Sequence, residues 1–65
     1  MELILTKHAK LRMIEKAITK EQIGITIQKG GKIKQTDGLL ASYGYLEVAY
    51  KTRDKKYIIK TVKIK

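Results

Sequence analysis

The chain has 65 residues, of which 43% are hydrophobic and 32% are charged, with no cysteine and a single histidine. This composition is typical of a folded domain, and it excludes disulfide frameworks, thiolate metal sites and cages of several histidines. Fifteen lysines and arginines against six acids give a net charge of +9, which is typical of proteins that bind polyanions such as nucleic acids. A lysine-rich proteome would produce the same charge without such a partner.

We predict one domain over residues 1–65, because a chain this short forms a single core. We also expect no metal and no cofactor. No apolar run approaches about 18 residues, the length that spans a membrane. The first residues also lack a signal-peptide pattern. We therefore expect a cytoplasmic protein without a membrane partner.

The N-terminal third is expected to be helical. The apolar lead Met1–Leu5 could pair as an edge strand or pack as an arm, and Thr6 then offers an N-cap hydroxyl. Residues 7–18 contain no glycine or proline and consist largely of good helix formers. Their apolar residues recur at helical spacing and predict a buried stripe: Ala9, Met13, Ile14, Ala17 and Ile18.

A second, shorter helix is predicted to start at Thr19. Thr19 and Gln22 fit a capping box, in which the hydroxyl and the amide each bind the other residue's backbone N–H. Ile23 and Ile27 would supply the inner face. Gly30-Gly31 should end the helix in the left-handed conformation that glycine adopts easily.

After Gly31 the apolar pattern changes to the period of two that is typical of strands. Three segments are predicted as strands: residues 32–36, 45–50 and 57–65. Asp37-Gly38 predicts a turn, residues 39–42 either a loop or the start of a strand, and residues 51–56 a hairpin connection. The predicted fold is α+β, with two N-terminal helices packed on one face of a three-stranded antiparallel meander sheet.

The last predicted strand has an inconsistent pattern. Ile58, Val62 and Ile64 share one face with Lys60, whereas Ile59 falls on the opposite face. Three explanations remain open: a bulge near Lys60, a sheet covered on both faces, or a groove beside the core that Lys60 lines.

His8 and Arg12 are the candidates for catalysis. They lie one helical turn apart, so both side chains can project toward one patch. Histidine can transfer a proton, and arginine stabilises charge that develops on a phosphoryl group, which are the functions that RNA cleavage requires. The alternative is structural: His8 packs against the sheet and caps a carbonyl.

The four tyrosines all lie in the second half of the chain, among lysines. Tyr50 shares its face with Leu46 and Val48 and is expected in the core, whereas Tyr45 and Tyr57 are expected on the other face. Tyrosines there could stack on bases while lysines hold phosphates. The candidate nucleic-acid-binding residues are Lys16, Tyr45, Arg53, Tyr57 and Lys60.

The motif His8-Ala9-Lys10-Leu11-Arg12-Met13, followed by Ile18-Thr19, resembles a small family of uncharacterised domains that open with an H-A-x-x-R-M helix. The resemblance runs from about Thr6 to Ile64. It implies a fold similar to the RelE- and BrnT-type toxins. It also implies either an endoribonuclease or an RNA- or ribosome-binding relative, with His8, Arg12 and basic sheet residues at its site.

Three classes of function follow. The first is an RNA-directed, toxin-like domain that cleaves or only binds RNA. The second is a non-catalytic nucleic-acid-binding protein. The third is a protein-interaction module. Because a small sheet exposes its edges, we also expect a homodimer, or an antitoxin-like protein that covers one edge.

Overall fold

The computed structural model describes residues 2–65, so that Met1 of the predicted N-terminal lead lies outside the described residues. The α+β class is confirmed. In chain order the elements are β1 (Glu2–Leu5), α1 (Lys7–Lys16), α2 (Lys20–Lys29), β2 (Gly31–Gln35), β3 (Gly38–Tyr43), β4 (Leu46–Arg53) and β5 (Lys56–Ile64).

The sheet differs from the predicted one. Five strands in the order β1-β5-β4-β3-β2 form a mixed sheet, in which β1 runs parallel to β5 and all other neighbours are antiparallel. The prediction of a three-stranded antiparallel sheet is therefore wrong. The lead residues form a strand because they pair with Lys56–Ile59. This partner lies at the other end of the chain, so no local pattern in the sequence indicates the pairing.

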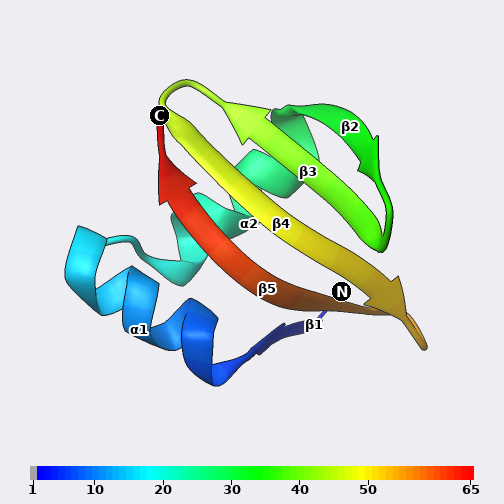
Figure 1. Cartoon of the computed structure of the whole chain (residues 1–65), viewed down its shortest axis with the longest axis horizontal. Coiled ribbons are helices and arrows are strands. Elements are labelled where there is room, and N and C mark those ends of the chain that lie inside the picture. The colour runs from blue at the N-terminus through cyan, green and yellow to red at the C-terminus, as the bar shows by residue number, and fades with distance from the viewer. Residues whose placement is uncertain (1) are drawn as a thin grey trace.

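The two helices also have different positions, contrary to the prediction that both pack on one face. In Figure 1, α2 crosses one face of the sheet and α1 lies beside β5 at the sheet edge. Accordingly, α2 contacts β3 and β4, whereas α1 contacts β5 and β1. Because β1 pairs with only the first part of β5, α1 flanks the part of β5 that β1 leaves free. Neither helix in residues 2–65 has the length and apolar character needed to cross a membrane.

Thr6 connects β1, α1 and β5. Its hydroxyl accepts a hydrogen bond from the Ala9 backbone at 3.1 Å, which confirms the predicted N-cap. The same hydroxyl lies 3.0 Å from the carbonyl oxygen of Ile59 and 3.2 Å from that of Lys60, to which it donates. The start of α1 is thereby fixed to the middle of β5.

The two helix ends depart from the predictions. The first helix ends at Ala17, which adopts the left-handed conformation at φ 54°. Of the predicted stripe, Ala9 and Ile18 are buried, whereas Ile14 is 80% exposed. The capping box at Thr19 and Gln22 is present as predicted. Gly30, however, is extended rather than left-handed; it is required because a Cβ there would lie 2.5 Å from the carbonyl oxygens of Thr26 and Ser42.

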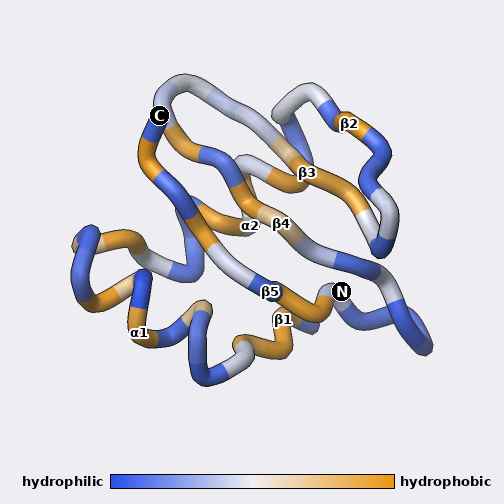
Figure 2. The backbone as a smooth tube through the Cα atoms, in the orientation of Figure 1, coloured by the Kyte–Doolittle hydropathy of each residue, from blue (hydrophilic) through white to orange (hydrophobic). Residues whose placement is uncertain are grey.

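A β-bulge in β5 resolves the inconsistent pattern of the last strand. Tyr50 pairs with Ile59 but Ala49 pairs with Thr61, so Lys60 is the additional residue between them. The bulge changes the alternation, and therefore both Ile59 and Val62 face α2 and are fully buried. Figure 2 shows hydrophobic positions alternating along β4, whereas β5 has a continuous hydrophobic stretch before the bulge.

The same bulge overturns the predicted orientation of one tyrosine. Tyr50 is 2% exposed, as expected for the core. Tyr57 was expected on the opposite face but packs edge-on against Tyr50, with ring centroids 5.5 Å apart. Its position was inferred from an alternation that the bulge interrupts.

The core lies between α2 and the sheet. Ile23, Thr26 and Ile27 of α2 are buried against Val48 of β4 and the apolar residues of β5. The other face of the sheet has no helix across it (Figure 1).

Candidate nucleic-acid interface

The face of the sheet opposite α2 is called the open face below. Its residues follow from the strand registers, as the positions that alternate with the buried ones. They include Ile33, Leu40, Ser42, Glu47, Ala49, Lys51, Arg53, Ile58, Lys60, Thr61 and Lys63. Basic side chains outnumber acidic ones within this set.

Lys51 and Lys60 converge on one carboxylate at the centre of the open face. Asp37 Oδ2 lies 3.8 Å from Lys51 Nζ and 3.7 Å from Lys60 Nζ. Lys60 Nζ also donates to the backbone carbonyl of Asp37. The Asp37 side chain is 71% exposed, so each pair contributes at most about 1 kcal/mol to stability.

The turn between β2 and β3 brings Asp37 to these lysines. Gly38 follows Asp37 at φ 112°, a conformation that other residues rarely adopt, and a Cβ there would collide with the carbonyl oxygen of Tyr50. The absence of that atom allows the turn to approach β4 closely. Any residue larger than glycine would move the carboxylate away from both lysines.

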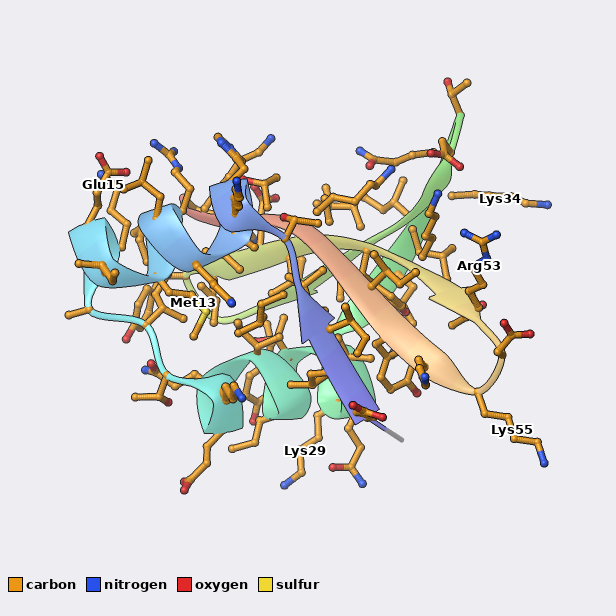
Figure 3. The ribbon with its side chains drawn as sticks, turned by 90° about the horizontal axis from the view of Figure 1, so that it is seen from below. Met13, Glu15, Lys29, Lys34, Arg53 and Lys55 are labelled. Carbon is orange, nitrogen blue, oxygen red and sulfur yellow. The ribbon has the colours of Figure 1, made fainter. Side chains whose placement is uncertain are left out.

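A polar stripe on α1 borders the open face. His8, Arg12 and Glu15 follow at intervals of four and three residues, so they lie on one side of the helix. Figure 3 shows Glu15 directed away from α2, opposite to Met13, which points between the helices. The stripe is thus on the same side of the sheet as the open face.

Arg12 is the most constrained side chain of this stripe. Its Nη1 lies 3.6 Å from Glu15 Oε1, and its Nε is buried without a hydrogen-bond partner. About a third of the side chain is exposed. Lys16 follows one turn later and is exposed. His8 is exposed too.

The predicted binding residues are only partly brought together. Arg12, Lys16 and Lys60 lie on the open-face side, whereas Arg53 projects at the end of the domain far from α1 (Figure 3). Tyr57 packs on the α2 side, and Tyr45 lies in the turn between β3 and β4. The two tyrosines are therefore separated from the converging lysines, and no aromatic ring of residues 2–65 lies on the open face.

Tyr45 instead borders an apolar hollow on the α2 side. Ile25 and Tyr43, both exposed, line it together with Tyr45, and its volume is about 230 Å³. His8 and Arg12 are not among its lining residues. The two catalytic candidates therefore lie on an exposed helix surface and not in this hollow.

Two residues of the site were not assigned correctly from the sequence. Lys51 was expected in the hairpin connection, but it lies in β4, where it alternates with the core residue Tyr50. Asp37 was read only as a turn residue, because the curvature that brings it over β4 depends on the close approach at Gly38.

Among the described residues, neither a metal site nor a shifted pKa distinguishes the open face. No group of three or more histidines and acids within residues 2–65 could hold a metal ion. The one resolved change is on the opposite side, where burial, and secondarily the neighbouring Tyr57, raises the pKa of Tyr50 above its ordinary value of 10.0.

Comparisons with protein-family models, with curated proteins and with solved structures gave no match for this chain. The resemblance to the H-A-x-x-R-M family thus stays a prediction. The function is therefore argued below from the residues of this chain.

Proposed function

We propose that this domain binds RNA and holds its phosphate backbone between the open face and the polar stripe of α1. The observation that carries the proposal is the convergence of Lys51 and Lys60 on the Asp37 carboxylate. Two ammonium groups that reach one anionic oxygen can reach a phosphate oxygen in the same way. Arg12 and Lys16 extend the positive charge toward α1.

The residue types favour binding without sequence recognition. Lysine interacts with phosphate as a point charge, whereas reading of bases relies on arginine forks, amides and aromatic stacking. The open face carries no aromatic ring among the described residues. Affinity should therefore depend steeply on salt and weakly on sequence.

A second candidate function is cleavage of the bound RNA, favoured by the partly exposed Arg12 side chain one helical turn from His8. In this mechanism His8 transfers a proton to or from a ribose oxygen, and the Arg12 guanidinium stabilises the charge on the phosphoryl oxygens.

Fluorescence anisotropy with a labelled single-stranded RNA of about 20 nucleotides, and with DNA of the same sequence, tests the first proposal. Lys51→Gln/Lys60→Gln should weaken RNA binding about tenfold or more and reduce the salt slope by roughly two phosphate contacts. The matched control is Lys20→Gln/Lys29→Gln on α2, which removes the same charge from the other side. The proposed interface would be refuted if both variants lost RNA affinity equally, or if the wild type did not bind RNA at low salt. Equal affinity for RNA and DNA would refute the choice of RNA.

Removal of the competing acid gives a change in the opposite direction. Asp37→Asn should raise RNA affinity severalfold, because it frees Lys51 and Lys60 from a carboxylate that occupies the position of the phosphate. An unchanged or lower affinity in this variant would show that the two lysines do not bind the backbone.

Cleavage is tested separately on the same RNA. If the second candidate is correct, the wild type cleaves, and His8→Ala and Arg12→Ala each lose about 10²–10⁴ in rate while binding is retained better than catalysis. An intact RNA after long incubation with wild type would leave a binding protein without nuclease activity.

A further inference from the structure

The outer edge of β2 is a free, regular strand edge. All five residues of Gly31–Gln35 are exposed, and the strand has neither a proline nor a bulge where it pairs with β3. Figure 1 shows β2 at the edge of the sheet opposite β1. An uninterrupted edge of this kind presents backbone N–H and C=O groups to which another strand can add.

The side chains of β2 differ on its two sides. Lys32 and Lys34 share the side of α2, and Lys34 points away from the domain in Figure 3. On the open face, Ile33 is 61% exposed beside its neighbour Leu40. The edge is therefore basic on one side and apolar on the other.

This pattern disfavours pairing with a second copy of β2. Consider two copies of β2 paired antiparallel, with the α2-covered faces of both sheets on the same side. Even-numbered residues of one copy then lie opposite even-numbered residues of the other, and odd-numbered residues opposite odd-numbered ones. In the centred register Lys32 lies opposite Lys34 of the second copy. A shift by two residues in either direction places Lys32 opposite Lys32, or Lys34 opposite Lys34. Like charges directly opposite each other destabilise a strand pair in all three registers.

We propose that β2 accepts an extended acidic strand from a protein partner, which adds to the sheet at this edge. The fitting segment alternates acid, apolar residue, acid: the two carboxylates lie opposite Lys32 and Lys34, and the apolar side chain covers Ile33. The inference rests on the β2 edge, which shares Ile33 with the open face, and it does not depend on RNA binding.

The test uses a labelled peptide with a Glu-Val-Glu-Val-Glu core and a second peptide with Lys in place of Glu. Wild type should bind the acidic peptide, and Lys32→Glu/Lys34→Glu should weaken it about tenfold or more and gain affinity for the basic peptide. Lys7→Glu/Lys10→Glu on α1 is the matched control, with the same change of net charge and an expected loss of less than about threefold. The amide resonances of residues 31–35 should move on binding.

Three results would overturn the proposal: equal losses in the two charge variants, shifts confined to residues outside β2, or equal binding of a Glu-Ser-Glu-Ser-Glu core that lacks the apolar positions. Lys34→Glu alone adds an independent measurement. In the centred register this substitution places a carboxylate opposite Lys32 of the second copy. Lys34→Glu should therefore self-associate through β2, whereas the wild type and Lys32→Glu/Lys34→Glu should not. Failure of Lys34→Glu to shift the amides of β2 with concentration would refute the argument from cross-strand charge.

Discussion

The two faces of the sheet carry similar residues in different surroundings. Ile58 and Ile59 are neighbours in β5, but Ile59 is fully buried under α2 and Ile58 is half-buried on the open face. Ala49 and Tyr50 of β4 are both buried but lie on different faces: the tyrosine belongs to the core cluster, and the alanine lies on the side of the lysines. The stability of the domain therefore resides in one face, which leaves the other available for binding.

The largest effect that tests this comparison is expected in the pair of isoleucines. Ile59→Ala should lower the free energy of unfolding by about 2–5 kcal/mol, because it leaves a cavity in a packed core. Ile58→Ala should cost about 1 kcal/mol or less. Urea titrations followed by circular dichroism measure both values. If Ile59→Ala does not fold, Ile59→Val should still cost about 0.5–1.5 kcal/mol; equal losses at the two positions would contradict the assignment of the faces.

Substitution of Thr6 tests whether its hydroxyl stabilises the bulge of β5. Thr6→Val keeps the shape of the side chain but removes the hydroxyl that caps α1 and donates to the carbonyls at Ile59 and Lys60. The expected loss is about 1–2 kcal/mol. Thr19→Val is the control, since it removes a more exposed cap that has no contact with β5, and should cost about 1 kcal/mol or less. A larger loss at Thr19 would show that the hydroxyl at Thr6 does not hold the bulge.

The smallest effect is the response of the core to alkaline pH. Because the pKa of Tyr50 is raised in the folded state, the unfolded chain loses this proton first, near pH 10. Stability from this group is fully present below pH 10 and falls as pH rises through the folded pKa. Unfolding titrations at pH 8 to 11 should show a smaller alkaline loss for Tyr50→Phe than for wild type. Parallel curves for the two proteins would show that this tyrosine does not contribute.

Much of the local structure could be predicted from the sequence, because its signals are short in range. The caps at Thr6 and Thr19 depend on residues three positions away, and the burial of Ile23 and Ile27 follows from helical spacing. The turn at Asp37 is likewise set by adjacent residues, and the predicted connection over residues 51–56 was correct only at Asp54-Lys55, since β4 extends to Arg53 and β5 begins at Lys56.

The features that were wrong depend on contacts distant in the chain. The number of strands was wrong although an edge strand was one of the two expectations for the lead residues, because β1 forms only by pairing with β5, and the face of Tyr57 was decided by the bulge in β5. At the site, His8 and Arg12 were correctly placed on one stripe, since this follows from the helical repeat. The placement of α1 relative to the sheet depends on its docking beside β5, which no periodicity in the sequence specifies.

The parallel pairing of β1 with β5 also determines when this domain can fold during its synthesis. Glu2 pairs with Lys56 and Leu5 with Ile59, so the first strand has no partner until the last strand has left the ribosome. The antiparallel strands β2, β3 and β4 can pair earlier, because their partners are adjacent in sequence. During translation the apolar segment Leu3–Leu5 therefore stays unpaired until β5 has been made, and a chaperone can reach it before the sheet is complete.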